Sequence, residues 1–271
     1  MNSSKPAALD FSFTGFSERG GRTGEHADGW GIAVHEAAGC RLIIDPLPST
    51  DSPLAAAFKQ QPGAGANFKA RNVIAHIRKA TQGRIAPENN HPFTRELWGR
   101  TWSFAHNGNL EGFHPAADPF YRSAGETDSE RAFCYLMAGL RRRFPLQSPS
   151  RAALYAAVAA MAAVIARHGS FNFILSNGDF LLAHCSTRLH YVVREYPFAC
   201  ARLIDCEVQI DFRQHNHLDD RIAVIATAPL TTGEHWQAFA PGELKMFCGG
   251  APVAVAAGTD AERPQRLAIS Y

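Results

Sequence analysis

Apolar side chains recur at every third or fourth position in two segments of the chain, and this spacing predicts two helices that each bury one face. The first spans 127–144, where Thr127 and Glu130 form a capping box and three arginines lie near the far end, as suits the helix dipole. The second spans 150–168 and is followed by Gly169, a residue that often ends a helix. Both helices require an apolar surface to pack against.

Short apolar or alternating runs fill most of the remaining chain and predict the strands of that surface. These runs are 31–35, 72–77, 101–106, 171–176, 180–185, 189–194, 207–212 and 221–228. The Asn177-Gly178 pair between two of them predicts a type I′ hairpin. Strands joined by short turns, with two adjacent helices inserted, indicate an α+β fold with antiparallel sheets. We expect one domain over 1–257 and a loosely attached tail over 258–271.

Composition narrows the class of protein. With 271 residues, of which 46% are hydrophobic and 19% charged, the chain can bury a full core, and disorder is excluded. The formal charge is only +2 and the basic residues are scattered, so nothing argues for nucleic acid. Six cysteines at irregular spacing without a C-x-x-C pair indicate reduced thiols, and no apolar stretch is long enough to span a membrane. We therefore expect a cytoplasmic protein.

Four short segments contain the candidate chemistry: AHIRKATQG at 75–83, ENNHPF at 88–93, AHNGNL at 105–110 and GETDSE at 125–130. Each alone is a weak signal. Arg78 follows an apolar strand, where its guanidinium either binds a carboxylate in a bidentate pair or simply faces water at the strand end.

The Asn107-Gly108 pair also allows two interpretations that are compatible. It is typical of a hairpin turn, and an asparagine amide beside a glycine N–H can also form an oxyanion site. Asp128 falls in the first turn of the first predicted helix, so it either complements the helix dipole or holds a ligand ammonium group opposite Arg78.

The histidines give weaker signals. His91 precedes a proline in a loop and by itself indicates a solvated side chain, whereas His106 in a predicted strand indicates a hydrogen-bonded core residue. His215 and His217 lie near two aspartates but lack a third ligand of matching spacing. We expect neither a metal nor a cofactor.

In this order the four segments resemble the class II glutamine amidotransferases, most closely the YafJ-like stand-alone glutaminases, and the resemblance extends over nearly the whole chain. It implies the N-terminal-nucleophile hydrolase fold, a four-layer αββα sandwich of two mainly antiparallel sheets. It also implies that Arg78 binds the α-carboxylate of glutamine and Asp128 its α-amino group. Thr81 and His91 would line the same pocket. The Asn107 side chain and the Gly108 N–H would form the oxyanion hole.

One departure concerns the nucleophile, which in this family is a cysteine at the mature amino terminus whose own α-amino group acts as the base. Here residue 2 is Asn2 and the first cysteine is Cys40. Ser3 and Ser4 carry no free α-amino group and cannot replace it. We expect the first residues to form the loop after a missing strand, Met1 to be an internal methionine, and the cysteine to lie upstream. Genomic DNA without an upstream Met-Cys would contradict this.

The leading functional hypothesis is hydrolysis of the side-chain amide of glutamine, or of another γ-glutamyl compound, through a γ-glutamyl thioester. The chain has no room for a synthase domain, so either a separate partner subunit accepts the ammonia or the substrate is another γ-glutamyl compound. Two alternatives stay open: a γ-glutamyl hydrolase of thiol metabolism, and a non-catalytic subunit that binds glutamine or a γ-glutamyl group. An acylase of the same fold class is disfavoured, because an Arg78 and Asp128 pair suits an α-amino acid. Nothing in the sequence specifies the oligomeric state.

Overall fold

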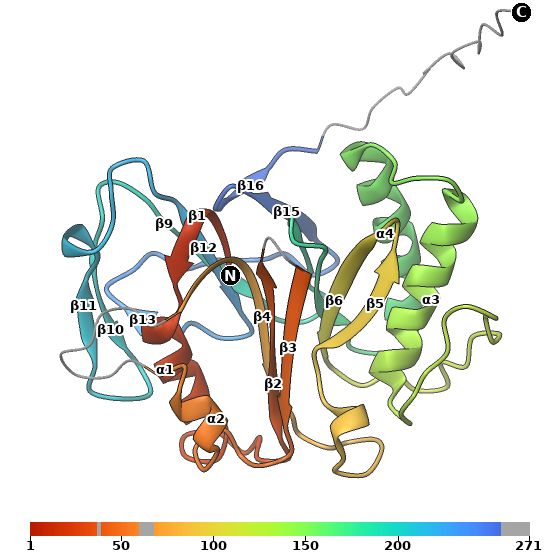
Figure 1. Ribbon diagram of the computed structural model, residues 1–271, viewed down its shortest axis with the longest axis horizontal. Helices are drawn as coiled ribbons and strands as arrows, with labels where there is room; N and C mark the ends of the chain where they lie inside the picture. The colour runs from red at the N-terminus through yellow and green to blue at the C-terminus, as the bar shows by residue number, and fades with distance from the viewer. Residues whose placement is uncertain (37–38, 60–67, 256–271) are drawn as a thin grey trace, which may run out of the picture.

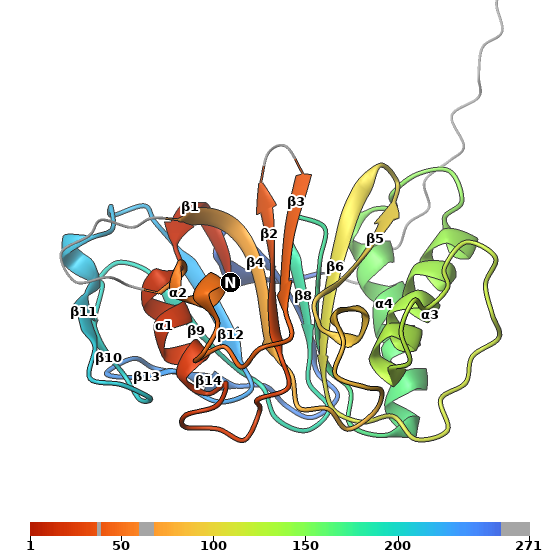
Figure 2. The same ribbon diagram turned by 60° about the horizontal axis from the view of Figure 1, so that its bottom comes forward.

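Two large antiparallel sheets face each other at the centre of the molecule, and helices cover their outer faces (Figure 1). The computed structural model describes residues 1–36, 39–59 and 68–255. Figure 2 shows α3 (Asp128–Arg143) and α4 (Arg151–Ile165) on one side of the paired sheets and α1 (Asp10–Glu18) and α2 (Pro53–Ala56) on the other. The α+β class and the four-layer αββα arrangement are confirmed, and the predicted tail at 258–271 lies outside the described residues.

The seven-stranded sheet has the order β14-β9-β12-β1-β4-β2-β3, and the six-stranded sheet has the order β16-β15-β8-β7-β6-β5. The strands of the first sheet are β1 (Asn2–Ala8), β2 (Trp30–Glu36), β3 (Gly39–Asp45), β4 (Lys69–Ile77), β9 (His190–Arg194), β12 (Ile222–Ala226) and β14 (Gln237–Ala238). Those of the second are β5 (Phe93–Leu97), β6 (Arg100–Asn107), β7 (Asn172–Ser176), β8 (Leu181–His184), β15 (Leu244–Cys248) and β16 (Ala251–Val253). A small third sheet contains β10 (Cys200–Leu203), β11 (Gln209–Asp211) and β13 (Thr231–Thr232).

The helices are α1 (Asp10–Glu18), α2 (Pro53–Ala56), α3 (Asp128–Arg143) and α4 (Arg151–Ile165), with short 3₁₀ turns η1 (Pro87–Asn89), η2 (Ala166–His168) and η3 (Phe212–Gln214). Both predicted helices are thereby confirmed. None of the helices in the described part of the chain combines the length and apolar character that crossing a bilayer requires.

The apolar face of α3 packs on the six-stranded sheet, where Phe133 stacks on Phe104 of β6 with ring centroids 5.0 Å apart. Only half of the predicted capping box forms. The Thr127 hydroxyl accepts the Glu130 N–H at 3.2 Å, but the Glu130 carboxylate accepts the N–H groups of Ala124 and Gly125 at 3.0 and 2.7 Å. The glutamate thus fixes the loop before the helix as well as its first turn.

The start of the chain is a strand and a helix, so the expectation of a loop there is wrong. β1 lies inside the seven-stranded sheet and leads directly into α1 (Figure 1). Its polar residues conceal the strand, because Asn2 is buried through hydrogen bonds rather than apolar contact: its Nδ2 donates to Asn72 and its Oδ1 accepts the Gly250 N–H, both at 2.8 Å.

The predicted hairpin between β7 and β8 is confirmed, but its type I′ geometry is wrong. That turn requires positive φ at both central residues, and within the described ranges Trp98 is the only residue other than glycine with positive φ. Asn177 instead accepts the Asp179 N–H through its side-chain oxygen at 3.1 Å. The strand predicted at 207–212 shortens to β11, because η3 begins at Phe212.

Candidate active site

The seven-stranded sheet contains a gap in line with β1. The Met1 amino group donates to the Val73 carbonyl at 2.8 Å, and the Val73 N–H donates back to Met1 at 2.9 Å. Beyond this pair β4 continues to Ile77 and β12 to Ala226, and neither strand pairs across the gap within the described residues. The gap has the width of one strand, because β1 separates the same two neighbours.

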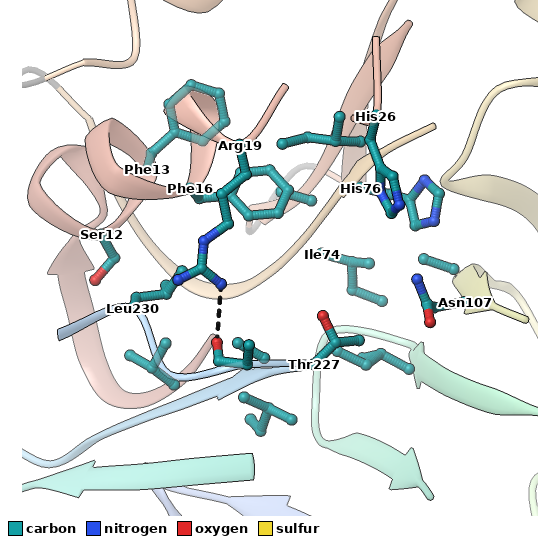
Figure 3. Close-up of a pocket in the computed structure, with 18 of the residues that line it drawn as sticks. Ser12, Phe13, Phe16, Arg19, His26, Ile74, His76, Asn107, Thr227 and Leu230 are labelled. Carbon is teal, nitrogen blue, oxygen red and sulfur yellow. Dashed lines mark hydrogen bonds between the residues drawn. The ribbon is translucent and has the colours of Figure 1, made fainter. Parts of the chain in front are cut away.

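A cavity of about 560 Å³ occupies this gap and reaches the space between the two sheets (Figure 3). Its lining includes residues 73–77 of β4 and 224–226 of β12 on the two sides of the gap. Figure 3 shows Phe13 and Phe16 of α1 at one side of the cavity and His76 and Asn107 at the other. The cavity therefore joins the gap in the sheet to the end of β6, where Asn107 lies.

Met1 is half-buried and also lines the cavity. Burial lowers the pKa of its α-amino group to about 5, since the charged form loses its hydration without gaining a carboxylate partner. The amine is therefore neutral at pH 7. It occupies a position where a peptide N–H would make the same bond to Val73.

Arg78 follows β4 and is only 3% exposed, so the alternative of a water-facing arginine is wrong. Its guanidinium donates to the carbonyls of Gln82, Gly83 and Arg84 at 3.0, 3.1 and 3.0 Å and thereby closes the loop that follows the strand. Burial lowers the pKa of Arg78 from its usual value. The loop fixes the guanidinium in place, and the binding of a carboxylate by its remaining N–H groups stays a prediction. Thr81 is exposed on the same loop, and its place in the pocket also stays a prediction.

Asn107 ends β6, and Gly108 begins the segment that leads to α3 rather than to a paired strand, so the hairpin predicted at this pair is wrong. Gly108 has a φ of +155°, and a Cβ placed on it would lie 1.9 Å from the Ser170 carbonyl oxygen. Only glycine fits this approach. The Asn107 side chain lines the cavity, and the oxyanion role of both residues remains a prediction.

Asp128 is 3% exposed and connects the first turn of α3 to the Asn107 segment. One carboxylate oxygen accepts the Leu110 N–H at 2.7 Å, and the other accepts the Ser129 N–H at 2.8 Å. Asp128 lies in the first turn of α3, which confirms the prediction that its negative charge complements the helix dipole. Binding of an ammonium group stays a prediction.

The loops that carry these residues touch one another. Arg78 donates to the Gln82 carbonyl, the Gln82 side chain donates to the Asn109 side chain at 2.7 Å, and the next residue, Leu110, donates to Asp128. The segments of Arg78, Asn107 and Asp128 therefore form one contiguous region beside the cavity.

Three histidines are packed into this region. His91 is buried against His76, with their Nδ1 atoms 3.2 Å apart, so its interpretation as a solvated loop residue is wrong. Its Nε2 atom has no hydrogen-bond partner within the described chain. His106 bonds Ser129 Oγ through Nδ1 and the Ser170 carbonyl through Nε2, at 2.8 and 2.9 Å, which confirms the prediction of a hydrogen-bonded core histidine.

Burial disfavours the charged form of these rings. It lowers the pKa of His76 to about 3 and holds the pKa of His91 well below its usual value, so both are neutral near pH 7. His215 and His217 lie exposed and far from this group in sequence, and the described residues contain no group of three or more His, Cys, Asp or Glu arranged to hold a metal ion.

We expect the protein to lose stability as the pH falls from about 6.5, the unfolded pKa of His76, toward its folded value of about 3. In this window the unfolded state binds a proton that the folded state excludes, and the loss reaches on the order of 3 kcal/mol by pH 4. Urea denaturation of the wild type and of His76→Asn at several pH values measures it. A wild-type slope that persists unchanged in the variant contradicts the assignment.

Several polar residues of this region could not be selected from the sequence by type alone: Gln82, Asn89 and Asn109. Each falls inside one of the four short segments, which was the available signal. Their contacts join loops that are far apart in the chain, and residue type and spacing do not reveal such contacts.

The chain is similar to proteins of one known family. The family model described as class-II glutamine amidotransferases matches residues 1–269. YafJ of Escherichia coli (strain K12), whose glutamine amidotransferase activity is itself a prediction, is 46% identical over 250 residues, covering 92% of this chain and 96% of that protein. A Haemophilus influenzae protein of the same predicted class is 45% identical over 262 residues, covering 97% and 87%.

Two solved structures are similar to this chain to different degrees. The crystal structure of a predicted glutamine amidotransferase from Pseudomonas aeruginosa PA01 gives a TM-score of 0.71 at 42% identity, covering 88% of this chain and 91% of that one. The glutamine phosphoribosylpyrophosphate amidotransferase of Bacillus subtilis gives a TM-score of 0.53 at 13% identity, covering 90% of this chain and 44% of that one. The second likeness shows the fold alone.

Proposed function

The chain belongs to the class II glutamine amidotransferases, and from this premise we propose that it forms the glutaminase site of an N-terminal-nucleophile hydrolase. Its substrate would be glutamine or another γ-glutamyl compound, cleaved at the side-chain amide. One observation carries the proposal: the strand-wide gap beside β1 opens through a single cavity onto Asn107, next to the loops of Arg78 and Asp128.

The gap supports a nucleophile carried on a strand that continues β1 backwards from Met1. Both neighbours present unpaired backbone to such a strand, and the Met1 nitrogen already makes the first bond to Val73. A peptide N–H at that position would donate the same bond to Val73 without the cost of keeping a buried amine deprotonated. We propose that a cysteine on this strand supplies the thiolate.

The register of β1 on β4 fixes where that cysteine would lie. Asn2 pairs with Asn72 and Met1 with Val73, so the fifth residue before Met1 would lie opposite Arg78. The Asn2 and Asn72 side chains bond each other, and Asn72 also bonds Gly178 in a hairpin of the second sheet. Because side chains alternate along a strand, the first, third and fifth preceding residues would face the second sheet as well.

The chemistry follows from these positions. The cysteine thiolate attacks the γ-carbonyl carbon, and the oxyanion accepts hydrogen bonds from the Asn107 amide and the Gly108 N–H. The α-amino group of the same cysteine, with an ordinary pKa of roughly 7.7 to 8.0, takes the thiol proton and delivers it to the leaving nitrogen. The carbon–nitrogen bond breaks, ammonia or an amine leaves, and water then hydrolyses the thioester. Where the leaving group is ammonia, a separate partner subunit would accept it.

The test extends the chain by a five-residue strand whose first residue, exposed by removal of the initiator methionine, is cysteine. We expect glutamate release from glutamine or a γ-glutamyl amide, and its loss when that cysteine is replaced by alanine. The matched control carries the same strand with the cysteine at its second position, where the thiol faces α1 and has no free α-amino group. Equal activity in both extended chains would contradict the mechanism, and ligand binding without turnover would favour a non-catalytic binding subunit.

A further inference from the structure

Asn89 is fully buried between the two loops that carry the proposed glutamine-binding charges. Its Nδ2 donates to the Arg84 carbonyl at 3.0 Å, and its Oδ1 accepts the Glu126 N–H at 2.8 Å. Both polar ends of one short side chain are therefore used, one on each loop.

Each of these contacts leads directly to a charged residue of the site. The Arg84 carbonyl that accepts from Asn89 also accepts from Arg78 Nη1 at 3.0 Å, so the amide and the guanidinium share one backbone oxygen. On the other side, Glu126 stands two residues before Asp128, just ahead of the first turn of α3. The Asn89 amide thus fixes the Arg78 loop against the segment that positions Asp128.

The packing around this amide leaves little freedom. A Cβ on Gly125 would lie 2.3 Å from Asn89 Oδ1 and 2.7 Å from the Glu88 carbonyl oxygen. The segment before α3 therefore approaches Asn89 so closely that only glycine fits at position 125. A change of a few tenths of an ångström at this junction would alter the separation of the two loops.

We propose that Asn89 is a positioning residue that sets the distance between Arg78 and Asp128, and so selects ligands whose α-carboxylate and α-amino group are separated as in an α-amino acid. This inference rests on the proposed function of the site. It adds that selectivity for the intact amino acid end depends on a residue that contacts neither charged group of the ligand.

The neighbouring Asn90 provides a matched control. It is 2% exposed and also donates through Nδ2 to a backbone carbonyl, that of Asp45 at 3.2 Å at the end of β3. It joins neither of the two loops. The same substitution at the two positions therefore distinguishes the effect of losing a buried amide from the effect of losing the contact between the two loops.

The experiment compares Asn89→Asp with Asn90→Asp in the chain that carries the cysteine strand. In Asn89→Asp the acceptor for the Glu126 N–H remains, while a carboxylate oxygen replaces the donor that faces the Arg84 carbonyl. We expect KM for glutamine to rise about tenfold with kcat changed less than twofold. We also expect the preference for glutamine over glutaramate, which lacks the α-amino group, to fall about tenfold. Asn90→Asp should leave this preference unchanged.

Calorimetric titration of the 271-residue chain with L-glutamate and with glutarate gives a second readout that needs no turnover. If Asn89→Asp fails to fold, Gly125→Ala tests the same contact, because it forces a methyl group toward Asn89 Oδ1. This variant should reduce the preference for L-glutamate over glutarate in the same way. If the wild type binds L-glutamate and both Asn89→Asp and Gly125→Ala keep the preference for L-glutamate over glutarate, only the positioning role is overturned. If the 271-residue chain binds neither ligand and the chain with the cysteine strand releases no glutamate, the proposed function is overturned as well.

Discussion

Replacing Gly108 by alanine is expected to lower kcat for γ-glutamyl amide hydrolysis by a factor of about 100 to 1,000 in the chain that carries the nucleophilic strand. The added Cβ would lie 1.9 Å from the Ser170 carbonyl oxygen and 2.8 Å from His106 Nε2, so the segment must shift. The shift displaces the residue 108 N–H from the oxyanion. Because the oxyanion exists only after attack on the carbonyl, KM should change little.

Gly112 provides the control for this substitution. It lies on the same connection to α3 and has a positive φ of +64°, but a Cβ placed there meets nothing within 4 Å. Gly112→Ala therefore carries the backbone strain without the clash. Steady-state kinetics on both variants, with thermal melts to verify folding, make the comparison. An equal loss of kcat at the two positions would show that strain in the connection, rather than the placement of the 108 N–H, causes the effect.

The parts of the fold that were predictable from the sequence are those held by apolar periodicity. Leu136 and Leu140 of α3 are fully buried at the spacing that predicted the helix. β1 was not predictable in this way, because Asn2 and Ser3 are buried by hydrogen bonds to Asn72 and to the carbonyl of Ala70, and hydropathy patterns do not register such burial.

The candidate site shows the same division. Order along the chain was enough to select Arg78, Asn107 and Asp128, and the structure brings their segments together. The sequence could not show that Arg78 is enclosed by carbonyls of its own loop, since that depends on the path of the backbone through Gly83, where φ is +73°. Nor could it distinguish Asn89 from Asn90, which are adjacent, alike in type and both buried, yet differ in what they join.

Removing the Glu234 carboxylate is expected to destabilise the fold by about 3 to 5 kcal/mol. Glu234 accepts two hydrogen bonds from Arg194, at 2.7 and 2.9 Å, and the two side chains are only 3% and 5% exposed. Arg194 also donates to Ser12 of α1 at 2.8 Å, and its guanidinium lies 4.4 Å from the Phe212 ring centroid. In Glu234→Ala the guanidinium stays buried without an anion, and that uncompensated charge produces most of the cost.

The reverse expectation holds when both charges are removed together. Arg194→Met with Glu234→Leu should recover much of the stability lost in the single variant, because no unpaired charge remains in the core. Glu207→Ala is the surface control: its partner Arg202 is 56% exposed and Glu207 itself 87% exposed, so the change should stay below about 1 kcal/mol. Urea denaturation of all three variants measures the differences. If the single and double variants were equally unstable, the loss of packing around Phe212, rather than the unpaired buried charge, would account for the lost stability.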